Sequence, residues 1–302
     1  MTRWGICTTT HAPTRDILHF AAFHLEAGAH RIYLYLDAPN PDALAHLDAH
    51  PKIRAILCDD ARWRGRRPQK HQVRQSQNAT HAYRRKQEVG WLIHMDVDEF
   101  LIAQRPIAQI LQDLPKDTAL TRVRPMEGLA GDGTAFKSFM PPGPERARLT
   151  RMLYPTFGAH LTAGFLSHVA GKIFVRTGLK DVRFQIHNAF QADAQLQGPS
   201  TTAGLDLAHC HAKSWEDWIA AFSFRLAKGA YRTPDKGCSQ LHELLSHLHQ
   251  SKGAAGLSAF FDEVVADTPA LRARLTRHGC LRTANTGLKH TIAHHFPSWS
   301  PY

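Results

Sequence analysis

Two aspartates separated by one residue, Asp96 and Asp98, directly follow a mostly apolar run at residues 91–95. Side chains alternate along an extended segment, so carboxylates at positions i and i+2 can face one ion. Hard divalent cations prefer oxygen ligands, and Mg²⁺ usually keeps water and substrate phosphates in its shell. The pair therefore predicts a metal–diphosphate site. The alternative is a solvated turn after a strand.

The histidines offer a second kind of metal ligand. His209 and His211 are one residue apart, but a purely imidazole zinc site there lacks a nearby third ligand. His242 and His247 lie next to Glu243 and Ser246 in an H-E-x-x-x-H sequence, five residues apart. The metalloprotease motif needs a spacing of four to place both imidazoles on one helix face, so this segment is expected to be a solvated helix.

A general base for deprotonating an acceptor hydroxyl would be an aspartate or glutamate. Glu127 and Asp132 are the candidates, in the glycine-containing stretch 126–133, which is predicted to be a loop. Glycines there would permit a mobile acceptor loop. The alternative is that both are ordinary loop carboxylates.

Positive charge is concentrated in one segment. The chain of 302 residues carries a formal net charge of +11, and residues 61–87 hold nine lysines and arginines without one acid. Such a segment predicts an anionic partner. One possible partner is nucleic acid, but the segment offers only Trp63 and Tyr83 for base stacking. The second is an anionic membrane surface. The third is a donor diphosphate, with Lys70 and Arg74 as the contacting residues. The last two are favoured.

Other common functional classes lack their motifs. The sequence contains no C-x-x-C, no phosphate-binding G-x-x-x-x-G-K and no dinucleotide-binding G-x-G-x-x-G. Its five scattered cysteines are expected to be reduced and mostly buried.

No run approaches the ~18 apolar residues of a membrane span, and the N-terminus does not resemble a secretory signal. The expected location is cytoplasmic, with peripheral contact at the inner face of the membrane through residues 61–87.

The elements that would position these residues alternate between strand and helix over the first hundred residues. Strands are expected at 4–10, 31–36, 52–57 and 91–95, and helices at 14–27, 42–50 and about 69–88. This alternation predicts βαβ units and a largely parallel sheet with helices on its faces, an α/β fold. Ligands bind off the carboxyl ends of such strands, which places Asp37 and residues 96–99 at one rim.

The rest of the chain divides into a mixed part and a helical part. Strands are expected at 119–123, 172–176 and 182–186, between glycine- and proline-rich loops. Helices are expected at 215–228, 239–250, 255–266 and 269–277. The predicted division is a catalytic domain at 1–213 and a helical C-terminal extension at 214–302.

The sequence WLIHMDVDEFL at 91–101 resembles the W-L-x-x-x-D-x-D-E-F-L signature of glycosyltransferase family 2-like proteins, including the related family 92 group. The order of further matches agrees with this resemblance, which spans residues 4–229. The matching segments are 23–28, 32–35, the D-x-x-x-x-D turn at 37–42, and HCHAKS at 209–214 followed by 215–218.

The resemblance implies a GT-A fold, in which a Rossmann-like mixed sheet is flanked by helices. It also implies a metal-dependent transferase that moves a sugar from a nucleotide diphosphate donor, UDP-linked, to a glycan or lipid-linked acceptor with inversion. By the same resemblance, Asp98 and His209 would bind Mn²⁺ or Mg²⁺, and Asp96 would reach the metal or the donor ribose. Catalysis by departure of a diphosphate needs positive charge where negative charge develops.

The remaining site residues implied by the resemblance contact the donor. Thr8 to Thr10 and Asp37 would hold the nucleoside, and Lys213 would meet the leaving diphosphate. The family usually carries K-N-E after its first strand, whereas this chain has Thr10-His11-Ala12 there. Two rival functions remain: a basic nucleic-acid-binding protein with an incidental D-x-D, and another metal-dependent phosphoryl-transfer enzyme.

Overall fold

The computed structural model describes residues 2–85, 88–229, 231, 239–286 and 289–300. The chain forms two compact units, and each consists of more than one stretch of sequence. Unit 1 comprises residues 1–124, 170–207 and 286–302, and unit 2 comprises residues 125–169 and 208–285.

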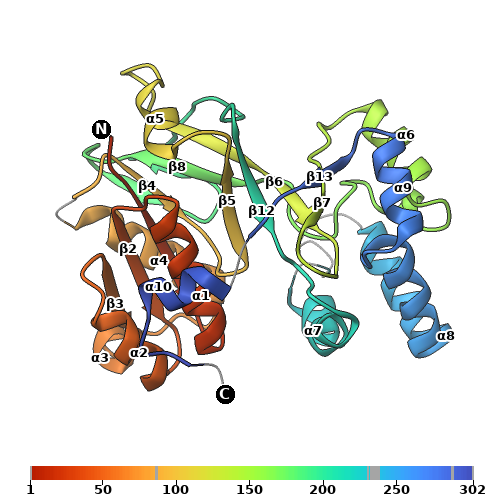
Figure 1. The fold of residues 1–302 in the computed structure, drawn as a ribbon, viewed down its shortest axis with the longest axis horizontal. Helices are drawn as coiled ribbons and strands as arrows, with labels where there is room; N and C mark the ends of the chain where they lie inside the picture. Colours follow the sequence, from red (N-terminus) through yellow and green to blue (C-terminus); the bar gives the residue numbers. More distant parts are fainter. Residues whose placement is uncertain (1, 86–87, 230, 232–238, 287–288, 301–302) are drawn as a thin grey trace. The chain divides into compact units, whose positions relative to one another are not determined.

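A parallel sheet is the centre of unit 1 (Figure 1). Its strands are β1 (Trp4–Thr10), β2 (Arg31–Leu36), β3 (Ile53–Leu57) and β4 (Trp91–His94), in the order β3-β2-β1-β4. β1 pairs in parallel with both β2 and β4, and β2 pairs in parallel with β3. From β1 the chain adds β2 and then β3 on one side, and β4 pairs with the other side of β1.

Antiparallel strands extend this sheet and make it mixed. β8 (Lys172–Arg176) pairs antiparallel with β4, and β6 (Leu120–Gly128) pairs antiparallel with β8. β5 (Glu99–Ala103) pairs with β12 (Leu205–His209) beside them. α5 (Ile107–Gln112) follows β5. The predicted α/β class is confirmed as a mixed sheet flanked by helices.

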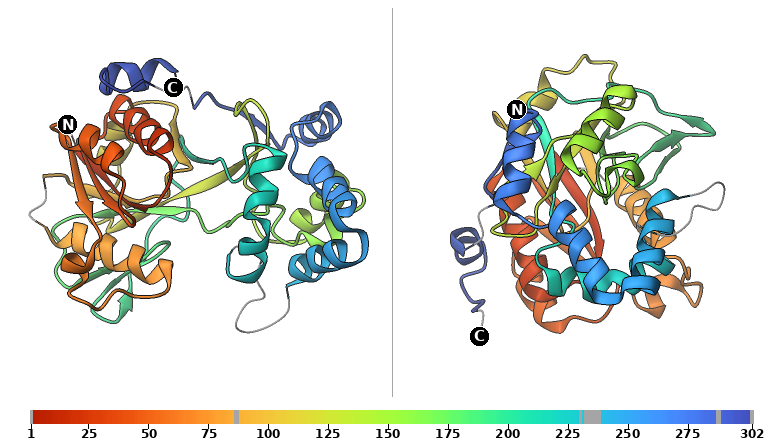
Figure 2. Two further views of the ribbon diagram at one scale, coloured as in Figure 1. Left: turned by 90° about the horizontal axis from the view of Figure 1, so that it is seen from below. Right: turned by 90° about the vertical axis from the view of Figure 1, so that its right-hand side faces the viewer.

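One face of the sheet is covered by α1 (Thr14–Glu26), α2 (Pro41–Asp48) and α10 (Lys289–His295). Trp4 and Ile6 of β1 share a hydrophobic cluster with buried residues of these helices, including Phe20, Leu47 and Ile292. α10 lies beside α1 although most of the chain separates them in sequence (Figure 2). The C-terminal residues therefore belong to the core of unit 1.

The opposite face is covered by α4 (His71–Arg84), with α3 (Asp60–Trp63) nearby, and by the small antiparallel sheet β9 (Val182–Phe184), β10 (Ala189–Gln191) and β11 (Ala194–Gln195). Cys7 of β1 lies in the cluster on this face, with Ala79, Tyr83 and Phe184. Because side chains alternate along β1, the apolar residues of one strand supply both faces.

Unit 2 combines a hairpin with helices. The end of β6 pairs with β7 (Ala135–Lys137), which pairs with β13 (Leu281–Thr283). The helices are α6 (Pro144–Leu153), the short 3₁₀ helix η1 (Gly158–His160), α7 (Trp215–Ala227), α8 (Gln240–Val264) and α9 (Pro269–Arg277). Their core is rich in large apolar rings, including Trp218, Phe222 and Phe260.

Most elements expected from the sequence are present. β1, β2, β8 and α9 have the predicted bounds, and the others differ by a few residues at their ends. The two helices expected near 239–266 form one element with a non-helical Gly253 inside it, at a φ of 54°. The predicted loop at 126–133 is wrong for its first three residues, because β6 continues to Gly128.

The division into units differs from the expected boundary at residue 213. Unit 2 takes residues 125–169 from the middle of the chain, and the boundary at 213 falls within its second stretch. Residues 286–302 return to unit 1, where Ile292 and Phe296 are buried. The order of elements along the sequence does not show that residues 125–169 belong to unit 2 or that residues 286–302 belong to unit 1. Among the residues that the structure describes, no helix has both the length and the apolarity to cross a membrane.

Candidate functional site

The carboxyl ends of the parallel strands bring several predicted residues to one edge of unit 1. β1 ends at Thr10, Asp37 follows β2, and Asp96 and Asp98 follow β4. The chain runs from β1 outward to β3 and then back across to β4, so the direction of winding reverses between β1 and β4. Ligands of open α/β sheets bind outside the carboxyl ends at such a point. The predicted common rim for Asp37 and residues 96–99 is confirmed.

Asp96 is held by two side chains from different elements. Its Oδ2 accepts a hydrogen bond from Lys172 Nζ at 2.7 Å, and its Oδ1 accepts one from Gln75 Nε2 at 2.5 Å. Lys172 begins β8, the strand antiparallel to β4, and Gln75 lies on the buried face of α4. The Asp96 side chain still retains 32% of its exposure, so it is both anchored and open to solvent.

Lys172 also contacts Glu99, at 3.3 Å from Nζ to Oε2, and neither side chain is exposed. Glu99 Oε2 accepts a hydrogen bond from the backbone N–H of Asp96 at 2.8 Å, which fixes the turn that carries the two aspartates. Burial alone would lower the pKa of Lys172, but the charges of Asp96 and Glu99 outweigh burial and raise it to about 12. Lys172 is therefore charged throughout the physiological range.

The charges of this group bear on metal binding. Lys172 pairs with both Asp96 and Glu99, so one ammonium group is shared by these two carboxylates. Asp98 is half-buried in the turn between β4 and β5. An ion bonded to both oxygens of Asp96 would have to displace Lys172 and Gln75. The group therefore fits a divalent cation held through Asp98 and a bound diphosphate better than one chelated by both aspartates.

His94 is the last residue of β4, and its side chain is fully buried. Within the described residues, neither of its ring nitrogens has a hydrogen-bond partner. Burial, reinforced by the charge of Lys172, lowers the pKa of His94 to about 4, so the imidazole is neutral. His94 lies two residues before Asp96, at the carboxyl end of β4.

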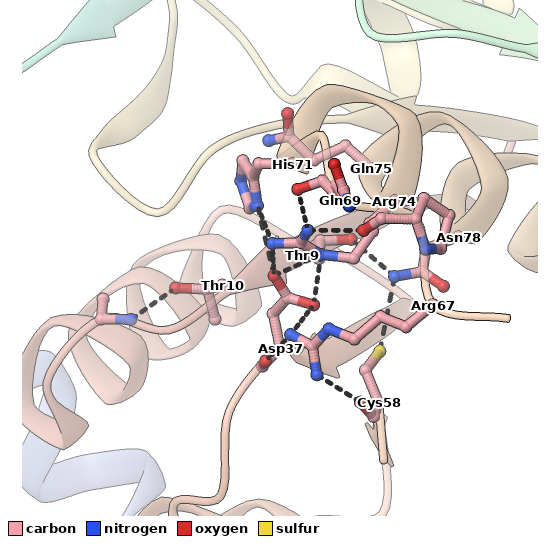
Figure 3. A network of polar contacts seen from close by, with 12 residues as sticks. Thr9, Thr10, Asp37, Cys58, Arg67, Gln69, His71, Arg74, Gln75 and Asn78 are labelled. Atoms are coloured by element: carbon pink, nitrogen blue, oxygen red, sulfur yellow. Dashed lines mark hydrogen bonds and ion pairs between the residues drawn. The ribbon is translucent and has the colours of Figure 1, made fainter. Parts of the chain in front are cut away.

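Asp37 lies at the centre of a second polar network (Figure 3). Arg74 donates to both of its carboxylate oxygens, from Nε and from Nη2, at 2.7–2.9 Å, and Arg67 donates to Oδ1 at 3.0 Å. Burial would raise the pKa of Asp37, but the hydrogen bonds and charge of Arg74 outweigh it, and the pKa is lowered. Its side chain is 2% exposed.

This network is a poor cation site. One nitrogen each of His11 and His71 and one oxygen of Asp37 lie within 4.8 Å of one another, which is a possible ligand set. The Asp37 oxygens are already bonded to two guanidinium groups, however, and these would repel an added cation. Arg67 also donates to Cys58 O, and Arg74 to Pro68 O, so the two arginines fasten the loop before α4 to the sheet.

The buried face of α4 connects the two networks. Gln75 reaches Asp96. Arg74 reaches Asp37, and Asn78 Nδ2 donates to Thr9 Oγ1 at 3.1 Å (Figure 3). Asn78 is fully buried. The basic segment 61–87 is therefore divided. Some of its side chains contact the residues at the carboxyl ends of the strands, and the others face outward.

The other predicted donor residues are placed as follows. Thr8 is buried in β1, and its Oγ1 has no hydrogen-bond partner in the described part of the chain. Thr10 accepts a hydrogen bond from Ala12 N at 3.0 Å. Lys70 is exposed at the N-cap of α4, and Lys213 is exposed before α7 in unit 2. Arg74 contacts Asp37, as described above.

Glu127, a predicted general base, is instead part of a closed ion pair in unit 2. It faces Lys137 across the β6–β7 hairpin at 2.6 Å, and both side chains are at most 3% exposed. Backbone N–H groups of Leu166 and Ser167 donate to its two oxygens. Burial would raise the pKa of Glu127, but the charge of Lys137 outweighs it and lowers the pKa to about 2. Such a carboxylate is a weak base and has no access to solvent.

Asp132 and His209 also lie in unit 2. Asp132 is exposed and accepts hydrogen bonds from the backbone N and the Oγ1 of Thr134. His209 ends β12 and is buried, with its ring 5.1 Å from that of His168 and 5.5 Å from that of His211. Asp96 and Asp98 belong to unit 1 and His209 to unit 2, so the three predicted metal ligands do not come from one unit.

Sequence reasoning missed Lys172, Gln75 and His94. Lys172 follows Asp96 by 76 residues, and a lysine at the start of a short apolar strand carries no sign of burial. Gln75 lies in a helix whose composition suggested a solvated basic surface. His94 could have been found, because it alone interrupts the apolar run before Asp96 and alternation places it on the α4 face.

The chain matches no protein-family model and no curated protein sequence. Among the solved structures that it is similar to is that of HddC from Yersinia pseudotuberculosis, with 11% sequence identity, coverage of 69% of this chain and 77% of that chain, and a TM-score of 0.32. A likeness this low supports no statement about function, so the proposals below rest on the residues of this chain.

Proposed function

We propose that this chain is a GT-A-fold glycosyltransferase of the family 2-like group, which transfers a sugar from a UDP-linked donor to a glycan or lipid-linked acceptor with inversion. One observation carries the proposal. The D-x-D pair follows β4 at the reversal point of the sheet, where Lys172 bonds to Asp96 and to Glu99 while the Asp96 side chain stays 32% exposed. This arrangement is suited to a divalent cation and a diphosphate.

In this proposal Asp98 holds Mn²⁺ or Mg²⁺ together with the diphosphate of the donor. The cation would supply positive charge where the leaving diphosphate becomes more negative. Asp96 has a positioning role: Gln75 and Lys172 fix its carboxylate at the rim, and its exposed part would face a ribose hydroxyl of the donor. Lys172 and Glu99 hold Asp96 in that orientation.

The nucleoside would lie over the ends of β1 and β2. Thr10 ends β1 and Asp37 follows β2, so both lie at the edge where the nucleoside would bind. Asp37 shapes the same rim through its hydrogen bonds with Arg67 and Arg74.

The two carboxylates expected to act on the acceptor, Glu127 and Asp132, both lie in unit 2. Glu127 is not proposed as the general base, because Lys137 neutralises it in a closed core. Asp132 remains a candidate, since it is an exposed carboxylate. His209 as a second metal ligand, Lys213 at the diphosphate, Lys70 at the donor and membrane contact through residues 61–87 also remain predictions.

Thermal unfolding in the presence of nucleotides tests the proposal. UDP with Mn²⁺ is expected to raise the melting temperature, since a ligand at 100 times its Kd stabilises the native state by about 2.7 kcal/mol. UDP without metal should have a smaller effect. Stabilisation by short DNA or RNA but not by UDP and Mn²⁺ would refute the transferase. Hydrolysis of ATP but of no nucleotide sugar would favour the phosphoryl-transfer alternative.

A further inference from the structure

The outward face of α4 forms one wall of a groove that has no role in the proposed donor site. The groove lies entirely within unit 1, between α3 and α4 on one side and the segment 183–188 around β9 on the other, and has a volume of about 880 Å³. Thr80 ties the two walls together: its Oγ1 donates to Phe184 O and accepts from Phe184 N, both at 3.0 Å. The groove is therefore built on fixed elements.

The charge of the groove is entirely positive. Arg62, Arg84 and Arg183 line it, and no aspartate or glutamate does. Among the described residues, none of these three guanidinium groups forms an ion pair. This contrasts with Arg67 and Arg74 of the same basic segment, whose charge is taken up by Asp37. The groove thus holds positive charge that no carboxylate among the described residues balances.

Aromatic rings hold two of the arginines in place. Arg62 lies over the rings of Trp63 and Tyr35, at 5.3 and 5.8 Å, and Arg183 lies over Phe190 at 5.1 Å. Contact with a ring restricts the guanidinium but leaves its edge donors available for an anion. Less side-chain entropy is then lost when a ligand binds.

Several neutral polar side chains also line the groove. Gln72, Gln77, Gln185 and Asn188 carry amides, and Ser76 carries a hydroxyl. Amides both donate and accept hydrogen bonds, as sugar hydroxyls do. Three fixed cations among many such groups match a ligand that combines hydroxyls with carboxylate, sulfate or phosphate groups.

The aromatic residues argue against a nucleic acid. Single-stranded nucleic acids bind by stacking bases on accessible rings. The two large aromatic side chains of the groove, Trp63 and Phe184, are only 7% and 0% exposed, so neither offers a face for a base. The imidazoles of His81 and His187 are half-buried and are held by hydrogen bonds with Tyr35 and with Gly171 O. The positive charge and the burial of the two large rings together favour a charged sugar chain over RNA or DNA.

We propose that this groove binds an acidic glycan, with Arg62, Arg84 and Arg183 contacting its anionic groups. One contact leads from the groove to the donor rim: Arg62 Nη2 donates to Asn78 Oδ1 at 3.2 Å, and Asn78 in turn donates to Thr9. α4 therefore carries glycan contacts on one face and rim contacts on the other. That the glycan is the acceptor rests on the proposed function, whereas its binding does not.

Calorimetric titration of the full chain tests the inference with defined probes. The probes are an oligogalacturonate hexamer, a heparin-derived hexasaccharide, neutral maltohexaose and a single-stranded DNA of matched charge. We expect at least one acidic hexasaccharide to bind, and maltohexaose to bind at least tenfold more weakly. The two acidic probes distinguish carboxylate from sulfate recognition. Binding by DNA more tightly than by both acidic glycans would overturn the inference.

Matched variants locate the binding. Arg84→Ala/Arg183→Ala removes two exposed groove cations, and Arg151→Ala/Arg277→Ala removes the same charge from exposed positions in unit 2. The groove variant should weaken acidic-glycan binding at least tenfold, and the control less than twofold. If the groove variant does not fold, Gln77→Glu places a carboxylate at an exposed groove position and should weaken binding similarly.

Two results would contradict the groove assignment: equal loss of binding in both double variants, or no binding of either acidic glycan to the folded wild-type protein. UDP and Mn²⁺ titrated into the same samples separate this inference from the proposed function. Loss of glycan binding with retained UDP binding concerns the groove alone. Failure of UDP to bind the wild-type protein would refute the donor site and leave the glycan result standing.

Discussion

Each of the two units contains a buried lysine bonded to carboxylate, and the two sites differ in what surrounds them. In unit 2, Lys137 and Glu127 are closed on every side: Val264 O accepts from the lysine, and the N–H groups of Leu166 and Ser167 donate to the carboxylate. In unit 1, Lys172 is equally buried, but it bonds to Asp96, whose side chain is 32% exposed.

The difference shows how similar residues can serve structure in one place and binding in another. The Glu127–Lys137 pair has no excess charge and no opening, so it has nothing to offer a ligand. The group around Lys172 joins one ammonium group to two carboxylates, Asp96 and Glu99, and lies at the edge where β4 ends. Burial of a lysine does not distinguish the two sites, whereas charge balance and access to solvent do.

The largest expected effect is the loss of Lys137. Lys137→Met leaves the Glu127 carboxylate buried without a counter-charge, which should lower the free energy of unfolding by roughly 3–5 kcal/mol. Urea denaturation measures this loss. The double variant Glu127→Gln/Lys137→Met should recover much of it, and a double variant as unstable as the single one would contradict a simple ion pair.

Lys172→Met should cost less, roughly 1–3 kcal/mol, because water reaches Asp96 and screens the uncompensated charge. Millimolar Mn²⁺ should restore part of the stability, since a cation can enter from the solvent and replace the ammonium group. Lys137→Met should gain nothing from Mn²⁺. Equal responses of the two variants, measured in parallel denaturations, would remove the distinction between the sites.

His24 of unit 1 is buried like the two lysines, but it carries no charge. His24 donates from Nδ1 to Phe20 O at 2.8 Å and accepts from Leu101 N at Nε2, a pairing that requires the neutral ring. Burial lowers its pKa from 6.5 to about 3. Below pH 6.5 the unfolded chain binds a proton that the folded chain does not, so acid destabilises the fold, by about 2 kcal/mol between pH 7 and pH 5.

His24→Gln should remove that contribution. Urea denaturation at pH 7 and at pH 5 is expected to show a smaller pH dependence for the variant than for the wild-type protein. His94 and His211 also have lowered pKa values and add to the wild-type slope, so some dependence will remain in the variant. An unchanged slope would mean that His24 is accessible to protons in the native state.

The smallest effect is expected at an exposed pair. Glu145 and Arg148 of α6 are bonded at 2.6 Å, but both side chains are more than half exposed. Solvent screens such pairs, and their net contribution is small. Glu145→Gln should leave the urea midpoint unchanged within error. A measurable loss would show that the short distance, and not burial, decides the strength of these pairs.

The sequence predicted the parallel part of the fold well because its signals are local. Alternation in β1 and β2, and the helical spacing in α1, specify both the elements and their buried faces. The common rim of Asp37 and Asp96 then follows from the geometry of parallel strands. Long-range pairing left no such signal: Lys172 reaches Asp96, and Lys137 reaches Glu127, only after the sheet and the hairpin have formed.

For the same reason, the sequence could not separate the two roles of the basic segment. Arg67 and Arg74 look like Arg62 and Arg84 in the sequence, yet the first two are bonded to Asp37 and the other two line the groove. Helical periodicity within α4 assigns residues to faces, but it does not show which face meets a carboxylate.

The central claim is that Asp98 belongs to a nucleotide–metal site, and the Kd for UDP at saturating Mn²⁺ tests it most directly. Asp98→Asn should weaken binding by roughly 10- to 100-fold, the loss typical for a charge-assisted contact. Asp113→Asn removes an exposed aspartate of unit 1 as a control and should leave the Kd unchanged. Equal Kd values for Asp98→Asn and the wild-type protein would contradict the account.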